Sequence, residues 1–171
     1  LKGEGPEDLT ELVLVLGSQM VVLAKKANTL EEAREMLIEV MKNGKATEKF
    51  KEFLNNQGGD SSIVDNPEKM PQAKYVIDVP AKTSGVISNI VADEIGIAAM
   101  LLGAGRATKE DEIDLAVGLM LRKKVGDAVK EGEPFVTIYA NRENVEDVKA
   151  KIYENISIAE TAVAPKLVHT V

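Results

Sequence analysis

The loop Gly103-Ala104-Gly105-Arg106 has residue types that bind phosphate in many proteins. Small residues let backbone amides approach an anion closely, and an arginine adds positive charge. The loop lacks the third glycine of a dinucleotide fingerprint and the Gly-Lys-Ser/Thr of a P-loop. Thr108 and Asp111 have the spacing of a cap for the following turn, which gives the glycines a structural purpose. We therefore predict a structural or domain-contact loop, with an anion contact as the alternative.

Acidic side chains are the next group of residues that could take part in catalysis or metal binding. Four of them follow the loop: Glu110, Asp111, Glu112 and Asp114. Carboxylates so close together could hold a metal ion, but they also suit the first turn of a helix, whose dipole end is positive. We predict helix-start charges. Asp60 and Asp65 fail as a calcium loop, because an EF-hand needs glycine at its sixth position and glutamate at its twelfth. Counted from Asp60, those positions hold Asp65 and Pro71.

The remaining reactive residue types are scarce. The sequence has no cysteine, which excludes disulfides, thiolate nucleophiles and cysteine zinc sites. His169 is the only histidine, and no G-x-S-x-G nucleophile motif accompanies it, so we predict a passive side chain. Five methionines fall on apolar faces and are predicted to fill the core: Met20, Met36, Met41, Met100 and Met120.

Two segments, residues 79–87 and 125–133, resemble the paired half-motifs of biotinyl and lipoyl carrier domains. Such carriers present a modified lysine, usually beside methionine, on a hairpin between the halves. Here a helix pattern and the Gly103–Arg106 loop intervene, and the pair Met41-Lys42 lies in a helix outside the region. The half-motifs therefore predict a shared architecture, a barrel-sandwich or hammerhead, without the carrier site.

The elements that position these residues fall into two parts. Residues 1 to about 70 are predicted to be helical, because apolar side chains recur at helical spacing. The first stripe consists of Leu9, Leu12, Val13, Leu16, Met20 and Leu23. A capping box at Thr29 and Glu32 starts a second helix, which Gly44 ends. A third helix turns Phe50, Phe53 and Leu54 inward. Three such amphipathic helices need a partner that covers their stripes.

The turn-rich segment 59–71 is the predicted linker, and from Ala73 the period changes to that of strands. Strands are predicted around 75–79, 85–90, 113–121 and 135–140, and helices at 95–102 and 143–155. The last helix is expected to bury Val145, Val148, Ile152 and Ile156 and to pair Glu146 with Lys149 and Asp147 with Lys151. The chain end, 167–171, could add an edge strand. The predicted fold class is α+β, with domains at 1–70 and 71–171.

Composition limits the classes of function. The 171 residues carry a net charge of −7, which argues against non-specific nucleic-acid binding. The basic run Arg122-Lys123-Lys124 is predicted to be a solvated strand end. No apolar run reaches the roughly 18 residues of a membrane span, and no signal-peptide pattern is present, so we expect a cytoplasmic protein. The start, Leu1-Lys2-Gly3, lacks methionine and enters a helix at once, which predicts a fragment.

Several motifs together resemble one enzyme family over essentially the whole chain. They are L-K-G-E-G-P-E-D-L-T-E-L-V-L-V-L-G-S-Q-M-V, N-Q-G-G-D-S-S-I-V-D, M-P-Q-A-K, G-V-I-S-N-I, L-G-A-G-R, D-E-I-D-L-A-V-G and V-G-D-A-V-K-E-G. The family is that of the pyrimidine-nucleoside phosphorylases, which includes thymidine phosphorylase. The resemblance implies that residues 1–70 are the closing helices of the catalytic domain plus linker, and that 71–171 are the C-terminal domain.

The resemblance also implies an activity. Members cleave pyrimidine nucleosides such as uridine, thymidine and deoxyuridine with inorganic phosphate, which gives the free base and (deoxy)ribose 1-phosphate. They are homodimers, and some bacterial members bind potassium. The family's phosphate loop, Lys-His-Ser-Thr-Gly-Gly, and its base-binding residues have no counterpart in this sequence. We therefore assign no catalytic, cofactor-binding or metal residue, and we expect the fragment alone to be inactive and structural.

Two alternatives stay open at the level of sequence. One is a related enzyme of the same superfamily, such as an AMP phosphorylase or an anthranilate phosphoribosyltransferase, which would differ in its base-contacting residues. The other is a non-enzymatic barrel-sandwich module.

Overall fold

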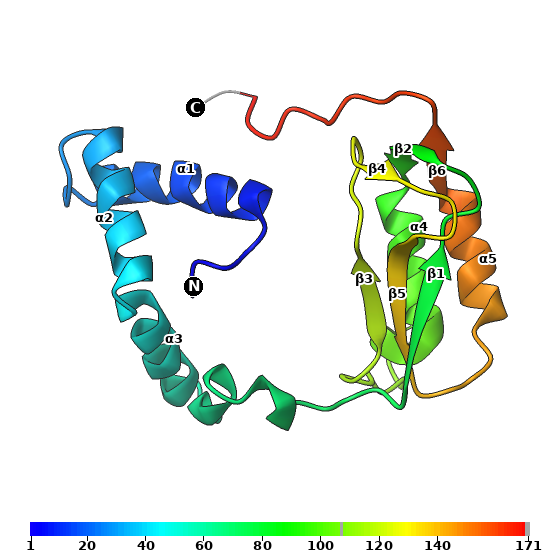
Figure 1. The fold of residues 1–171 in the computed structure, drawn as a ribbon. Helices are drawn as coiled ribbons and strands as arrows, with labels where there is room; N and C mark the ends of the chain where they lie inside the picture. Colours follow the sequence, from blue (N-terminus) through cyan, green and yellow to red (C-terminus); the bar gives the residue numbers. More distant parts are fainter. Residues whose placement is uncertain (107, 170–171) are drawn as a thin grey trace. The chain divides into compact units, whose positions relative to one another are not determined.

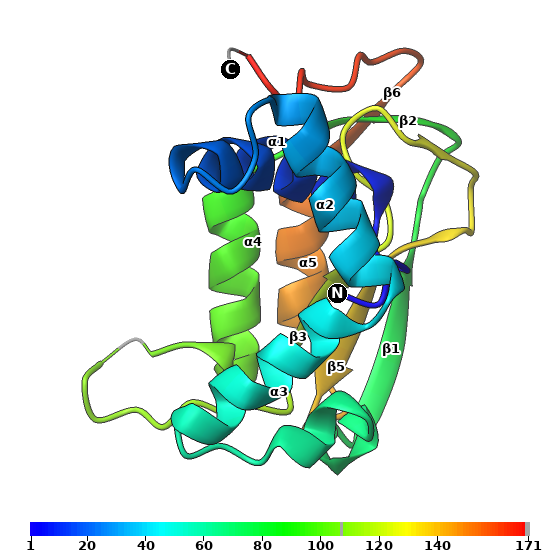
Figure 2. The same ribbon diagram turned by 90° about the vertical axis from the view of Figure 1, so that its left-hand side faces the viewer.

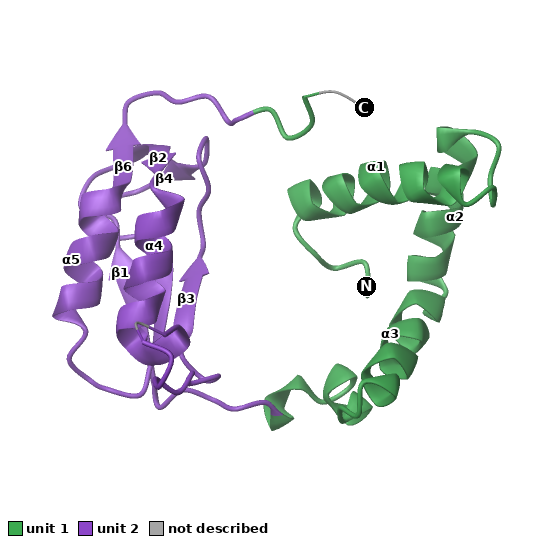
Figure 3. Ribbon diagram, turned by 180° about the vertical axis from the view of Figure 1, so that it is seen from behind, with its two compact units in different colours: residues 1–69, 166–171 green, residues 70–165 purple. Residues whose placement is uncertain are grey.

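The computed structural model describes residues 1–106 and 108–169, which form two compact units. One unit contains residues 1–69 and the chain end from Lys166, and the other contains residues 70–165 (Figure 3). The expected assignment of 1–70 and 71–171 to two domains of a phosphorylase stays a prediction.

The first unit is helical, as expected. Its elements are α1 (Glu7–Leu23), α2 (Leu30–Lys42), α3 (Lys45–Asn56) and the 3₁₀ turns η1 (Ser61–Val64) and η2 (Pro67–Lys69) (Figure 1). The predicted capping box starts α2, because the Thr29 hydroxyl accepts a hydrogen bond from the Glu32 amide at 3.1 Å. The carboxylate of Glu32 accepts one from the Asn28 amide at 2.9 Å. Gly44 ends α2 with a left-handed φ of 81°.

The helices of this unit bury few side chains. Leu14 of α1 is 4% exposed and Ala33 of α2 is fully buried. The opposite stripe of α1 is between 50% and 78% exposed, and it consists of Leu9, Val13, Leu16, Met20 and Leu23. Phe50 and Phe53 stack on each other at 6.4 Å, but they are 39% and 56% exposed. The prediction that these rings point inward is wrong, because both remain exposed to solvent.

The methionine prediction fails for the same reason at three positions. Met20, Met36 and Met120 are 68%, 42% and 48% exposed, so they do not fill a core. Met41 and Met100 are half-buried. The apolar periodicity of the sequence therefore shows which helix and strand faces could pack. Whether such a face is buried depends on the elements around it.

The second unit contains two antiparallel sheets of three strands each among the described residues. One has the order β1 (Tyr75–Pro80), β5 (Pro134–Ala140), β3 (Gly118–Leu121), and the other has the order β4 (Ala128–Val129), β2 (Gly85–Ile90), β6 (Ile156–Ala159). Strand β6 was not predicted. The expected edge strand of the chain end is not formed within residues 160–169, and positions 170–171 lie outside the described residues.

Helices α4 (Ala92–Ala99) and α5 (Glu146–Asn155) lie side by side in this unit (Figure 2). As predicted, Val145, Val148, Ile152 and Ile156 are buried, and they join one core with Val136 and Ile138 of β5. The unit has mixed helices and antiparallel sheets, which confirms the α+β class. None of the helices in the described part of the chain is long and apolar enough to cross a membrane.

The two half-motifs pair with each other. Ala81 donates its amide hydrogen to the Glu133 carbonyl at 2.9 Å, and Gly132 donates to the Ala81 carbonyl at 2.8 Å. Ile87 bonds in the same reciprocal way with residues 126 and 127, at 2.9 Å each. This pairing fits the expected shared architecture, while the hammerhead topology in particular stays a prediction.

Of the two ion pairs expected on α5, one is confirmed. Lys149 contacts Glu146 at 2.7 Å. Asp147 pairs with Arg142 at 2.7 Å, and Lys151 pairs with Glu94 of α4. The predicted Asp147–Lys151 pair is wrong because each side chain has a partner outside the helix. Arg142 holds the pKa of Asp147 below its usual range through their hydrogen bond.

Candidate functional site

The loop from Gly103 to Arg106 leaves the end of α4 through a π-helical turn, η3 (Met100–Ala104). Gly103 has a φ of 103°, which side chains other than glycine rarely adopt. A Cβ on Gly105 would lie 3.3 Å from Cγ of Met100, which is a tight contact. Both glycines therefore have structural reasons to be present, as the sequence predicted.

Asp114 connects this loop to the sheet. Its amide donates to the carbonyl of Gly103 at 2.9 Å, and one carboxylate oxygen accepts from the Ala116 amide at 2.9 Å. The other oxygen accepts from Nδ2 of Asn141 at 2.7 Å, just after β5. The Asn141 side-chain oxygen in turn accepts from the Lys74 amide at 2.9 Å, just before β1. Both ends of the loop are thus held at the end of the sheet where β1 begins and β5 finishes.

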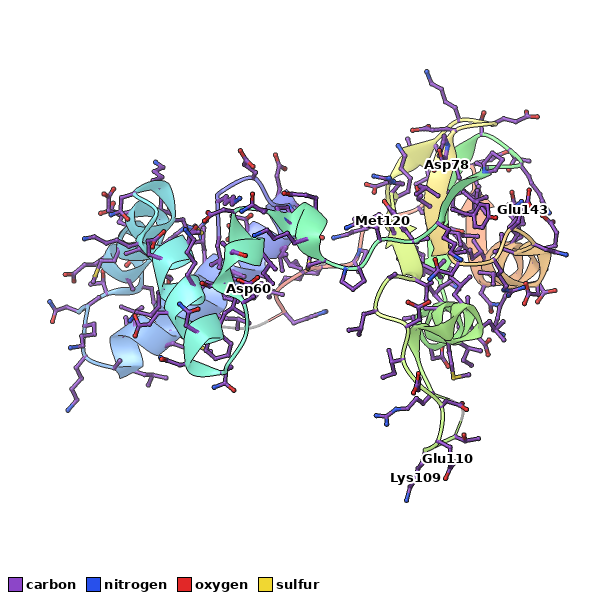
Figure 4. All side chains as sticks on the ribbon, turned by 90° about the horizontal axis from the view of Figure 1, so that it is seen from below. Asp60, Asp78, Lys109, Glu110, Met120 and Glu143 are labelled. Carbon is purple, nitrogen blue, oxygen red and sulfur yellow. The ribbon has the colours of Figure 1, made fainter. Side chains whose placement is uncertain are left out.

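The tip of the loop is differently organised. The amide and the hydroxyl of Thr108 both donate to the carboxylate of Asp111, at 2.9 Å each. Lys109 and Glu110 are exposed and point away from the unit in Figure 4. The prediction of helix-start charges is wrong, because residues 111–114 form no helix. Asp111 closes a turn and Asp114 anchors the loop, so the carboxylates serve hydrogen bonds rather than a helix dipole.

The chemistry available in this loop is limited. Both carboxylate oxygens of Asp114 accept hydrogen bonds, which makes it a positioning residue. Within residues 1–106 and 108–169, no three His, Cys, Asp or Glu side chains are grouped closely enough to hold a metal ion. Arg106 is exposed. The alternative of an anion contact at Arg106 therefore stays a prediction.

The other acidic candidates stabilise turns. Asp60 caps η1: its two oxygens accept from the amide and the hydroxyl of Ser62, at 2.8 Å each. The hydroxyl bond, followed by the amide bond, lowers the pKa of Asp60. Asp65 pairs instead with Lys51 of α3 at 3.0 Å. Asp60 (labelled in Figure 4) and Asp65 therefore bind different partners, each within the helical unit.

The basic run after β3 does not form one patch. Arg122 donates from Nε to the hydroxyl of buried Thr137 at 3.0 Å, and this hydroxyl donates to Asp78 at 2.7 Å. Lys123 pairs with Glu133 at 2.8 Å. The hydrogen bond from Lys123, then that from the Lys130 amide, lowers the pKa of Glu133. The run follows a strand end as predicted; Arg122 contacts Thr137 of β5, and Lys123 contacts Glu133, which directly precedes β5.

The remaining candidates, His169 and the pair Met41-Lys42, belong to the first unit. His169 is exposed in the chain end, where its carbonyl oxygen accepts a hydrogen bond from Lys166 Nζ at 3.3 Å. The pair Met41-Lys42 belongs to α2 and its C-terminal boundary, outside the paired half-motifs, as expected.

The sequence did not reveal Asn141 and Lys74 as parts of the loop anchor. Asn141 lies 27 positions from Asp114, and Lys74 lies 67 positions from Asn141. A single asparagine after a strand usually indicates a turn, and no local spacing connects it with an aspartate so far away. The bond between Lys74 and Asn141 exists because β1 pairs with β5, and the bond between Asn141 and Asp114 exists because β3 pairs with β5.

Comparison with known proteins gives consistent matches. Residues 86–159 match the family model of the pyrimidine nucleoside phosphorylase C-terminal domain. The chain is 79% identical over 170 residues to the pyrimidine-nucleoside phosphorylase of Bacillus subtilis, covering 99% of this chain and 39% of that protein. The enzyme of the same name from Geobacillus stearothermophilus is 66% identical, with 99% and 39% covered. That of Staphylococcus haemolyticus is 63% identical, with 100% and 40% covered. The chain therefore spans about two fifths of the length of these curated relatives.

Proposed function

We infer, since this chain belongs to the pyrimidine-nucleoside phosphorylase family, that it is the C-terminal part of an enzyme that cleaves pyrimidine nucleosides with inorganic phosphate. The substrates would be uridine, thymidine and deoxyuridine, and the products the free base and (deoxy)ribose 1-phosphate. The observation that carries this inference is the high identity to named phosphorylases along nearly the whole chain.

The reaction requires two kinds of group. Backbone amides, a lysine and hydroxyls must hold the phosphate anion, and donors or cations must stabilise the charge that develops on the departing pyrimidine. The described loop offers two exposed cations, Arg106 and Lys109, and the carboxylates of Asp111 and Asp114, which accept hydrogen bonds within the loop and from Asn141. We propose that the groups that perform the chemistry belong to parts of the enzyme outside this sequence. The chain alone would be structural and inactive, with phosphate, and in some members potassium, bound elsewhere.

The exposed stripe of α1 supports the assignment of residues 1–70 to the closing helices of the catalytic domain. Leu16 and Leu23 on this stripe are 51% and 78% exposed in a helix whose other face is packed. A stripe of this kind normally faces a core. In the complete enzyme, the catalytic domain would cover it.

The loop at Gly103–Arg106 supports a role in closure. It is fixed at its base by Asp114, while its tip extends into solvent. A loop with such a base can meet another domain without disturbing the sheet behind it. We place the complete enzyme in the cytoplasm as a homodimer, since the sequence has no cysteine and the resemblance implies a dimeric family.

A hybrid polypeptide tests the proposal. This chain would replace the matching part of the Bacillus subtilis relative, and phosphate-dependent release of uracil and thymine would be measured against the unaltered relative. We expect the hybrid to be active and this chain alone to release no base at high concentration. A folded but inactive hybrid would contradict the assignment to this enzyme. Base release by the chain alone would contradict the structural role.

A further inference from the structure

The junction between α2 and α3 contains Asn43-Gly44, the only Asn-Gly pair in the sequence. Asn43 is the residue that ends α2, and Gly44 directly precedes α3 with a φ of 81°. Asn43 is exposed. A Cβ added to Gly44 would meet no atom within 4 Å, so the space around this peptide is open. Chemistry between an asparagine side chain and the next peptide nitrogen depends on such access.

The side-chain amide of Asn43 is held from both ends. Its oxygen Oδ1 accepts a hydrogen bond from the Lys45 amide at 3.1 Å. Its nitrogen Nδ2 donates to the carboxylate of Glu39 at 3.2 Å. A donor on the carbonyl oxygen stabilises the negative charge that forms there when a nucleophile adds to the carbon. The carboxylate orients the nitrogen that would leave.

The nucleophile would be the backbone nitrogen of Gly44. It donates to the Met41 carbonyl at 3.3 Å, whereas the preceding amide, that of Asn43, donates to Glu39 at 3.0 Å. Asn43 has a ψ of 3°, so attack on its side chain requires rotation about its Cα–C bond. This rotation breaks the long hydrogen bond from the Gly44 amide to the Met41 carbonyl, which lies at a helix end, where fraying is easiest. The absent side chain of Gly44 leaves the rotation unhindered.

We propose that Asn43 is a site of spontaneous deamidation in this protein. The Gly44 nitrogen gives its proton to solvent base and bonds to Cγ of Asn43. The tetrahedral oxyanion on Oδ1 then collapses and expels Nδ2, which takes a proton from solvent and leaves as ammonia. Water next opens the cyclic imide at either carbonyl, which yields aspartate or isoaspartate. The oxidation state of the chain is unchanged, and water is the only co-reactant.

The product changes the electrostatics of the junction. A new carboxylate at position 43 replaces the donor to Glu39 with a like charge four positions away on α2, which is unfavourable. It also places negative charge at the C-terminal end of α2, where the dipole disfavours it. The same charge favours the N-terminus of α3. Deamidation therefore loosens the end of α2 while keeping the acceptor for the Lys45 amide.

The chain contains a matched internal control. Asn144 is also exposed, and its side-chain oxygen also accepts a hydrogen bond from the amide two positions later, that of Glu146, at 3.2 Å. The residue after it is Val145, whose branched side chain is 1% exposed in the core. The two asparagines therefore share the polarising bond and differ in access to the following nitrogen.

The experiment incubates the folded chain at mildly alkaline pH and follows both sites by peptide-mapping mass spectrometry with isoaspartate detection. We expect Asn43 to convert at least about tenfold faster than Asn144, which corresponds to a barrier lower by about 1.4 kcal/mol. The variant Gly44→Asn retains a residue that tolerates left-handed backbone and should slow conversion at position 43 to the rate of Asn144. Equal rates at Asn43 and Asn144 in the unaltered chain would overturn the proposal. An undiminished rate in a folded G44N variant would also overturn it.

Discussion

Single glycines in the second unit set how closely its backbone segments approach one another. Gly85 begins β2 beside β6, and an added Cβ would lie 2.5 Å from the Ala159 carbonyl oxygen and 2.7 Å from Ile158 Cγ2. Gly126 has a φ of 98°, and a Cβ there would lie 2.7 Å from Cβ of Ala164. The chain after β6 can therefore cross the turn at residue 126 only because that position has no side chain.

We predict that Gly85→Ala lowers the free energy of unfolding by about 1–3 kcal/mol, since the backbone of β6 must move to admit a methyl group. Urea denaturation followed by tyrosine fluorescence measures the change. Gly118→Ala is the matched control, because Gly118 also lies in a strand of this unit and has open space around its Cβ position. A loss in G118A as large as that in G85A would contradict the close-contact explanation.

At the scale of elements, helix α1 has two apolar faces with different surroundings. Leu14 is 4% exposed within the helical unit, and Leu16, two positions later, is 51% exposed. One face of the helix is thus packed. The second face is also made of apolar side chains, as a packed face would be, but it is exposed. Helical periodicity predicted the stripe that contains Leu16 and did not predict the burial of Leu14 on the other face.

We predict that Leu14→Ala costs about 2–5 kcal/mol of stability, as expected when a buried leucine is truncated. Leu16→Ala should change stability by no more than about 0.5 kcal/mol, as is usual for exposed positions. Urea titration followed by far-ultraviolet circular dichroism compares the two variants of the same helix. Equal losses would show that the stripe containing Leu16 is covered in solution.

At the scale of the whole chain, the two units differ in how much core they possess. The buried cluster of the second unit draws on strands of both sheets and on helices α4 and α5. In the described part of the first unit, the buried hydrophobic residues are Leu14, Ala27 and Ala33. Because burial of apolar surface is the main stabilising contribution, the second unit should be the more stable one.

We predict two separate unfolding transitions. The three tyrosines, Tyr75, Tyr139 and Tyr153, all belong to the second unit, and the sequence has no tryptophan. Tyrosine fluorescence therefore reports that unit, while the far-ultraviolet helical signal comes mostly from α1, α2 and α3. The helical signal should be lost at lower urea concentration. Coincident curves would indicate one cooperative molecule and contradict the prediction.

Much of this fold could be predicted from local patterns. The caps at Thr29 and Gly44, the strands at 75–80 and 134–140 and the buried face of α5 depend on spacing over a few residues. The motifs that resemble a phosphorylase are equally local, and the comparisons agree with them. Hydrogen bonds and side-chain periodicity act at short range, so the sequence determined them by itself.

Other features were decided only by the tertiary structure. Asp114 became the anchor of a loop instead of a helix-start charge because the pairing of β3 with β5 brings Asn141 to it. Lys151 pairs with Glu94 on α4 instead of with Asp147 on α5. Long-range partners depend on which elements meet, and the exposure of an apolar face depends on what covers it. The spacing of nearby residues predicts neither the long-range partners nor the exposure of a face. Spacing indicates which side chains share a face, but it does not indicate which other element that face will contact.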